Sequence, residues 1–123
     1  MKTSSLCYTI VVLGPVYGTQ QTYLAYQFAL KLLESKHMLK HVFFYSAGVS
    51  NANCQVNSAS DDFDISAAWQ RLAREENVSL SFCASAGLRL GINKKVNIMS
   101  GFEVGSLTGL SEAIANSDRV IQF

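Results

Sequence analysis

A continuous apolar run near the start of the chain constrains the fold more than any other feature. Residues 6–13 are apolar and β-branched at their centre, and the run stops at Gly14-Pro15. A run without polar alternation is typical of a strand covered on both faces, as in a parallel sheet. Parallel strands are joined by crossovers, so we expect helices to alternate with strands along the chain.

The remaining sequence follows this alternation. Strands are predicted at residues 41–46, 78–83, 102–104 and 119–123, with a short helix at 84–89 and a long polar loop at 49–62. Asp64 is placed to cap a helix. Apolar residues recur at helical spacing in three stripes, which are Leu24, Ala25, Phe28, Ala29, Leu32 and Leu33; Ile65, Ala68, Trp69 and Leu72; and Leu107, Leu110, Ala113 and Ile114. We expect one α/β domain over residues 1–123, with three α/β/α layers and a mostly parallel five-stranded sheet with right-handed crossovers.

Length and charge exclude several classes of function. The chain has 123 residues, which is one ordinary domain, and a net charge of +1. This balance provides no basic excess for nucleic acid or anionic membranes, so direct binding to either is not expected. Charged residues make up 15% of the chain, against roughly 25% in an average soluble domain. We therefore expect a partner to cover part of the surface.

The amino-terminal run does not have the features of a targeting segment. It is short for a signal core, and no small-x-small cleavage site follows it. No apolar stretch reaches the roughly 18 residues needed to span a bilayer. The chain has 3 cysteines, Cys7, Cys54 and Cys83, without a CxxC pair. This pattern favours free thiols in a reducing compartment, the cytoplasm, over a disulfide framework.

Cys83 is the strongest candidate for chemistry. It falls at the carboxyl end of the predicted strand 78–83, where loops and helix amino ends converge in an open parallel sheet. A helix at 84–89 would direct unpaired amides and its positive dipole end at the sulfur, which favours the thiolate. The small residues that follow, Ala84, Ser85, Ala86 and Gly87, would let another protein's backbone approach. The alternative is an inert buried cysteine, since free Cys packs as a small hydrophobe.

The other reactive side chains are weaker candidates. Cys7 is expected at the amino end of the sheet, away from such a site, and Cys54 in a polar loop. His37 and His41 are expected at the edge opposite Cys83, which does not suit a Cys–His catalytic pair. No carboxylate and histidine cluster has metal-ligand spacing, so neither a zinc nor an iron site is expected.

The loop at residues 14–21 occupies the place where nucleotide-binding folds hold a phosphate. It contains neither GxGxxG nor the Gly-Lys-Ser/Thr ending, so the motif does not support a phosphate site. The simpler interpretation is that Gly14 and Gly18 permit a tight loop that lines the same rim as Cys83.

Five sequence blocks match a known family, nearly from end to end. They are Gly14-Pro15-Val16-Tyr17-Gly18-Thr19-Gln20-Gln21, Val42-Phe43-Phe44-Tyr45, Gly48-Val49-x-Asn51-Ala52-Asn53, Ser58-Ala59-Ser60-Asp61 and Asp118-Arg119-Val120-Ile121-Gln122-Phe123. Together they resemble the DsrE family of sulfurtransferases. In this family the sulfur-carrying cysteine follows a strand and precedes Ala-rich residues and an Arg, which here are Cys83 and Arg89. The resemblance implies a persulfide on Cys83 and no cofactor.

The resemblance also implies partners. Such a subunit would accept sulfur from a TusA-like donor and pass it to a TusE-like acceptor, for 2-thiolation of the wobble uridine of tRNA. It would assemble with TusB-like and TusC-like subunits as a dimer of heterotrimers. By this resemblance the segment 90–101 is shorter than its family counterpart, and we expect the shortening to trim a partner contact or a lid over the cysteine.

Three other functions stay open on the residues alone. They are a DsrE-type subunit in sulfur oxidation, a non-catalytic scaffold subunit of the same assembly, and a flavodoxin-like nucleotide binder. A scaffold does not need a thiol at Cys83, and the nucleotide binder would need the phosphate-loop residues that the chain lacks.

Overall fold

The computed structural model describes residues 5–93 and 95–123; Lys94 and residues 1–4 lie outside the described residues. The elements follow in the order β1 (Cys7–Val12), α1 (Gln21–Glu34), β2 (Met38–Phe44), the 3-10 helix η1 (Ser46–Ala52), α2 (Ile65–Glu76), β3 (Ser79–Cys83), α3 (Ala84–Arg89), β4 (Phe102–Gly105), α4 (Leu107–Ala115) and β5 (Arg119–Gln122). The predicted alternation of strands and helices is confirmed.

The strands form one 5-stranded sheet in the order β4-β3-β2-β1-β5, and every neighbouring pair is parallel. Central β1 and β2 are the most apolar strands. Ile10 and Phe44 are fully buried on one face of the sheet, and Val11 and Phe43 are 6% and 2% exposed on the other. Burial on both faces explains why these strands lack polar alternation. The predicted parallel α/β architecture is confirmed.

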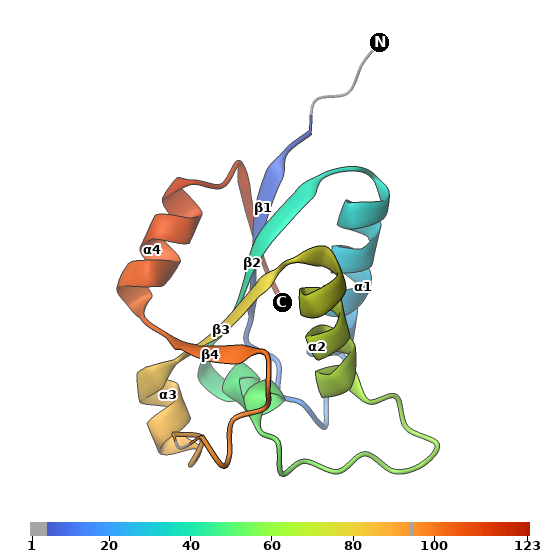
Figure 1. Ribbon diagram of the computed structural model, residues 1–123, viewed down its shortest axis with the longest axis vertical. Helices are drawn as coiled ribbons and strands as arrows, with labels where there is room; N and C mark the ends of the chain where they lie inside the picture. The colour runs from blue at the N-terminus through green and yellow to red at the C-terminus, as the bar shows by residue number, and fades with distance from the viewer. Residues whose placement is uncertain (1–4, 94) are drawn as a thin grey trace.

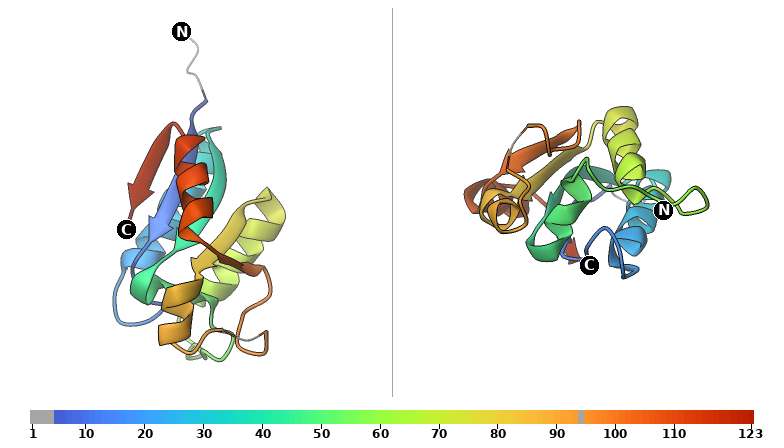
Figure 2. Two further views of the ribbon diagram at one scale, coloured as in Figure 1. Left: turned by 90° about the vertical axis from the view of Figure 1, so that its left-hand side faces the viewer. Right: turned by 90° about the horizontal axis from the view of Figure 1, so that it is seen from below.

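Helices cover both faces of the sheet (Figure 1). Alternate residues of β1 show which helix lies on which face. The Tyr8 ring lies edge-on to Phe28 of α1, with centroids 6.1 Å apart. The neighbouring Thr9 hydroxyl lies 2.6 Å from that of Ser117, just after α4. Thus α1 and α2 pack on one face and α4 on the other, as the turned views also show (Figure 2).

The face under α1 and α2 contains the aromatic centre of the core. The Trp69 ring is fully buried and lies edge-on to Tyr26 and to Phe44, each with centroids 5.5 Å apart. Asp64 caps α2 as predicted, because its carboxylate accepts a 3.1 Å hydrogen bond from the amide of Ala67. No helix among the described residues is long and apolar enough to cross a membrane.

The sequence misplaced two segments. Strand β2 begins at Met38 rather than residue 41, since Lys40 and His41 break the apolar pattern but still lie in the strand. The 3-10 helix Ser46–Ala52 occupies the start of what was expected to be a polar loop. Its polar composition did not indicate a helix, because Ser50 and Asn51 form hydrogen bonds within the fold.

Helix α4 forms where the apolar stripe predicts a helix, but most of that stripe is not buried. Ala113 is the one buried residue among the described residues of this helix. Leu107 and Ile114 are 50% and 42% exposed. The helix therefore presents apolar side chains to the outside of the chain.

Gly48 tests how closely η1 lies over the end of β1. A Cβ on Gly48 would lie 2.1 Å from the carbonyl oxygen of Val12, whereas one on Gly109 in α4 would meet ordinary contacts at 3.5 Å. We expect Gly48→Ala to lower the free energy of unfolding by more than about 2 kcal/mol, because backbone must shift. Gly109→Ala should be neutral or stabilise by up to about 1 kcal/mol. Urea denaturation measures both, and equal effects would contradict the close approach.

Candidate active site

Cys83 lies where the sequence predicts it, as the last residue of β3 and the residue that precedes α3. Its backbone is extended, with φ −68° and ψ 123°, and it serves as the N-cap position of α3 without a side-chain cap hydrogen bond. The residue is 4% exposed. Its thiol is thus nearly enclosed at the carboxyl edge of the sheet.

Helix α3 packs closely against Phe82 and against the segment that follows the helix. A Cβ on Gly87 would lie 2.6 Å from the carbonyl oxygen of Ile92 and 3.1 Å from the Phe82 ring. The amide of Ile92 donates a 2.7 Å hydrogen bond back to the carbonyl of Gly87. Ala84 and Ser85, directly after Cys83, are exposed. The cysteine is therefore bordered by small side chains that leave room for another protein.

Helix η1 lies beside this site, where it contacts both β3 and α3. It begins at Ser46, whose φ of 55° is left-handed. This conformation costs a non-glycine residue of the order of 1 kcal/mol, so the surrounding packing must maintain it. The close approach of Gly48 to Val12 sets η1 across the carboxyl ends of the central strands.

Buried Asn51 joins η1 to the loop after β1. Its side-chain amide donates to the carbonyls of Gly14 and Gly48, at 3.1 and 2.8 Å. Its side-chain oxygen accepts from the Thr22 hydroxyl of α1 at 2.9 Å. Three elements at one sheet edge are thereby connected through one fully buried side chain.

Helix α2 joins the same network. The indole Nε1 of Trp69 donates to the Thr22 hydroxyl at 2.9 Å, and the Ser66 hydroxyl donates to the backbone carbonyl of Asn51 at 2.9 Å. Within residues 5–93 and 95–123, no buried side-chain nitrogen or oxygen lacks a hydrogen-bond partner. Sequence reasoning assigned no role to Asn51, although an amide between the apolar Val49 and Ala52 is a signal of buried polar structure.

The other cysteines lie elsewhere. Cys7 opens β1, at the amino edge of the sheet. Cys54 is exposed in the loop after η1, and its thiol donates to the carbonyl oxygen of Val96 at 3.0 Å. The three described cysteines are free, and the structure brings neither of these two into the elements that flank Cys83.

Neither histidine forms a pair with Cys83. His37 lies at the amino edge, where its Nδ1 accepts a 3.0 Å hydrogen bond from the amide of Leu6. His41 pairs with Ser79, the first residue of β3. Cys83 lies four residues further along that strand, about 13 Å away at the usual rise. In the described part of the chain, no group of His, Cys, Asp and Glu could hold a metal ion.

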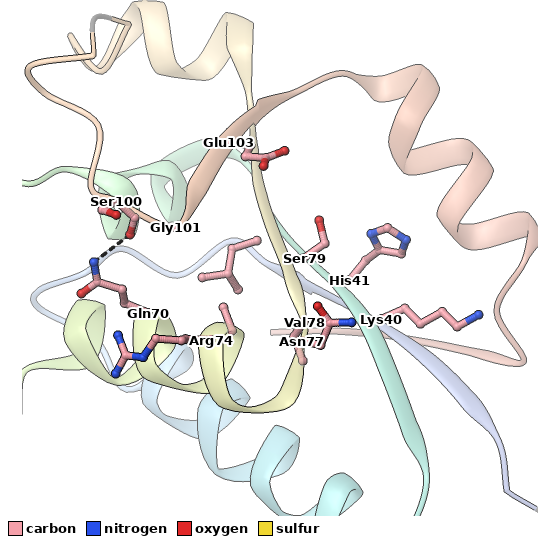
Figure 3. Close-up of a pocket in the computed structure, with 12 residues that line it drawn as sticks. Lys40, His41, Gln70, Arg74, Asn77, Val78, Ser79, Ser100, Gly101 and Glu103 are labelled. Carbon is pink, nitrogen blue, oxygen red and sulfur yellow. Dashed lines mark hydrogen bonds between the residues drawn. The ribbon is translucent and has the colours of Figure 1, made fainter.

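A cavity of about 730 Å³ opens at the amino ends of β3 and β4 (Figure 3). Cys83, at the opposite end of β3, is not among the residues that line it. The charged and polar lining of the cavity includes Lys40, His41, Arg74 and Glu103. The Gln70 amide nitrogen crosses from α2 to the carbonyl of Ser100 at 2.8 Å. The cavity therefore plays no part in the environment of the thiol.

Comparison with known proteins identifies the family. The model of the DsrE/DsrF-like family matches residues 7–123. The chain belongs to this family. A relative named Sulfurtransferase TusD, from Photorhabdus laumondii, is 45% identical, and the alignment covers 98% of this chain and 99% of the relative. The protein of the same name from Yersinia pestis is 43% identical with the same coverage. The resemblance to the DsrE family is confirmed.

Two solved structures share the fold. The ychN protein from E. coli superposes with a TM-score of 0.83 at 22% identity, covering 96% of this chain and 99% of that one. MTH1491 from Methanobacterium thermoautotrophicum gives a TM-score of 0.70 at 13% identity, with the same coverage. The alignment with the first relative spans 130 positions, more than the 123 residues of this chain, so that relative carries additional residues.

Asn51 allows a test of whether its buried hydrogen bonds hold together the elements at the carboxyl edge of the sheet. We expect Asn51→Ala to lower the free energy of unfolding by about 3 kcal/mol, because three buried hydrogen bonds are lost and their partners stay unsatisfied. The matched change is Asn97→Ala, which removes one exposed bond from the Asn97 amide to the carbonyl of Gly91 and should cost less than about 1 kcal/mol. Chemical denaturation of both variants measures the difference, and equal losses would contradict a central role for Asn51.

Proposed function

We propose that this chain is a persulfide-carrying sulfurtransferase subunit of a sulfur relay, with Cys83 as the sulfur-carrying thiol. The observation that carries the proposal is the place of Cys83, between the end of β3 and the close-packed α3. The curated relatives that align over 98% of the chain are sulfurtransferases by name. We take residues 1–123 as one domain that works in the cytoplasm.

Two displacement steps account for transfer. The Cys83 thiolate attacks the terminal sulfur of a donor persulfide, the donor's S–S bond breaks, and the donor thiolate leaves with the electron pair. Cys83 then holds an S–SH group. An acceptor thiolate attacks the outer sulfur, and the Cys83 thiolate is released. Each step exchanges one S–S bond for another, as in thiol–disulfide exchange, so no external oxidant or cofactor is needed.

The surroundings of the three thiols favour Cys83. At 4% exposure, its persulfide would be shielded from bulk reductant. Ala84 and Ser85 leave access for an incoming thiol. Cys54 is exposed, and its proton is engaged with the carbonyl of Val96. Transfer would thus be confined to a partner that docks at the carboxyl edge.

Apolar side chains on the face of α4 support an assembly. Leu107 and Ile114 are exposed on α4, and Val120 of the edge strand β5, whose partner Thr9 faces α4, is 39% exposed. Apolar surface of this kind is characteristic of stable subunit interfaces. We propose TusB-like and TusC-like subunits as the occupants, in a dimer of heterotrimers.

The relay would extend beyond this assembly. A TusA-like protein would deliver sulfur to Cys83, and a TusE-like protein would receive it for 2-thiolation of tRNA wobble uridine. The net charge of +1 supports contact with tRNA through partners rather than through this chain.

Cys83→Ser tests the chemistry. After incubation with a persulfide donor, intact mass spectrometry should show added sulfur on the wild type and none on Cys83→Ser, because serine cannot form the S–S bond. Cys7→Ser and Cys54→Ser are the matched controls and should retain the added mass. Sulfur mapped to Cys54 would overturn the assignment of Cys83, and a wild type that takes none would favour a scaffold subunit.

Charge placed on α4 tests the assembly. We expect Leu107→Glu with Ile114→Glu to abolish co-elution with TusB-like and TusC-like subunits in size-exclusion chromatography, since a buried carboxylate would lose its hydration. Leu24→Glu changes a similarly exposed leucine, 52% against 50% for Leu107, on α1. It should leave the complex intact. A wild-type chain that stays monomeric beside both subunits would contradict the proposed partners.

A further inference from the structure

A second cavity lies at the carboxyl edge of the sheet, and we name it the aromatic pocket. It has a volume of about 430 Å³ and opens between the first turn of α1, with the loop before it, and the segment that enters α2. Its exposed apolar side chains are Tyr17 (83% exposed), Tyr23 (40%), Val56 (39%) and Phe63 (52%). Three exposed aromatic rings around one cavity are characteristic of a binding surface rather than of an ordinary solvent-exposed segment.

The pocket is formed without an occupant. The Phe63 ring lies edge-on to Tyr23, with centroids 5.5 Å apart, and its centroid is 5.9 Å from that of Tyr26. Thr22, which also lines the pocket, is held by its hydrogen bonds to Asn51 and Trp69. A site whose walls are already packed loses little conformational entropy on binding.

Charge and ring chemistry favour a cation. Asp62 and Asp64 line the pocket, and its lining contains no Lys, Arg or His. The faces of Tyr and Phe rings attract ammonium and guanidinium groups, as carboxylates do. The long stems of Lys and Arg also cover apolar surface. An anion such as a phosphate would be repelled by the same carboxylates, although the amino end of α1 lies here.

The pocket is linked to the elements around Cys83. The amide of Val16, in the pocket wall, donates to the Ser50 hydroxyl of η1 at 2.9 Å. Helix η1 in turn contacts β3 and α3, which flank Cys83. A typical protein partner covers about 800 Å² on each side. One docked protein can therefore contact both the aromatic pocket and the rim of Cys83.

Burial of the thiol indicates which relay partner needs such a contact. Cys83 is 4% exposed, so the donor must bring its terminal sulfur to an enclosed atom in a fixed orientation. Both displacement steps place the Cys83 sulfur, the transferred sulfur and the partner's sulfur in line, so orientation is needed in each. The donor is the partner that meets Cys83 as the free, enclosed thiol described here, and we therefore take the donor as the protein that docks beside it.

We propose that the aromatic pocket docks a segment of the sulfur donor that carries a Lys or Arg beside an apolar side chain. The proposal rests on the proposed function for the existence of a donor, and it adds where and by what chemistry that donor is held. The aromatic rings hold the apolar part of the segment, and Asp62 and Asp64 attract its charge.

Binding measurements with the purified TusA-like donor test the docking site. The full chain, within its assembly, is titrated against the fluorescently labelled donor by anisotropy. Asp62→Lys and Tyr17→Ala should each weaken the Kd by about tenfold, typical of an interface charge pair and an aromatic anchor. Asp62→Lys should also reduce the salt dependence of binding. Tyr17 is 83% exposed, so its truncation leaves the core intact.

Two controls match these changes outside the pocket. Glu76→Lys reverses an exposed charge at the other end of α2, and Leu24→Ala truncates an exposed side chain of α1. Both should keep the Kd within about twofold of the wild type. Donor affinity unchanged in Asp62→Lys and Tyr17→Ala, or weakened equally in the controls, would overturn the docking site.

Two further readouts separate the competing explanations. The intact mass of the chain is recorded in parallel after incubation with the donor. Sulfur that is absent, or bound to a residue other than Cys83, overturns the proposed function. The Kd values decide the docking site independently of that result. A fluorescent anticodon stem-loop RNA is titrated in the same way. RNA binding that weakens in Tyr17→Ala and strengthens in Asp62→Lys would overturn a cationic protein segment as the occupant.

Discussion

The carboxyl edge of this fold depends on one buried amide. The Asn51 side chain satisfies carbonyls of the loop after β1 and of η1, and it also accepts from the helix α1 hydroxyl of Thr22. These groups are inaccessible to water, so each needs a partner within the protein. Because Trp69 and Ser66 of α2 join the same network, the edge behaves as one body. The surroundings of the cysteine and of the aromatic pocket are set by that body.

The packed carboxyl edge of the sheet is combined with apolar side chains that this chain leaves exposed. Cys83 is enclosed by close-packed α3, whereas Tyr17, Phe63 and the apolar side of α4 face outward. The proposed role of Cys83 as a sulfur carrier needs both properties, since the sulfur must be shielded in transit and reached only by a docked protein. The low fraction of charged residues in the sequence, 15%, agrees with these exposed apolar side chains.

Sequence patterns predicted the parallel sheet and the place of Cys83 because both depend on local signals. Continuous apolar runs indicate buried strands, and a strand followed by small residues defined the thiol's position. The patterns did not reveal η1, the role of Asn51, or the outward turn of Leu107. Those features arise from contacts between segments distant in sequence, such as Thr22 with Asn51 and Trp69. A helical stripe shows that one face is apolar, but not whether this chain or another protein covers it.

The strand order leaves one edge of β1 unpaired until late in the synthesis of this sheet. Central β1 precedes β2 in the chain and can pair with it early in synthesis, but its other edge waits for β5, which comes after the other described strands. The amide of Cys7 even bonds to the carboxylate of Asp118, 111 residues later, at 2.8 Å. Until β5 is made, an apolar strand edge stays open to other nascent chains. Removal of β5 would leave that edge permanently unpaired.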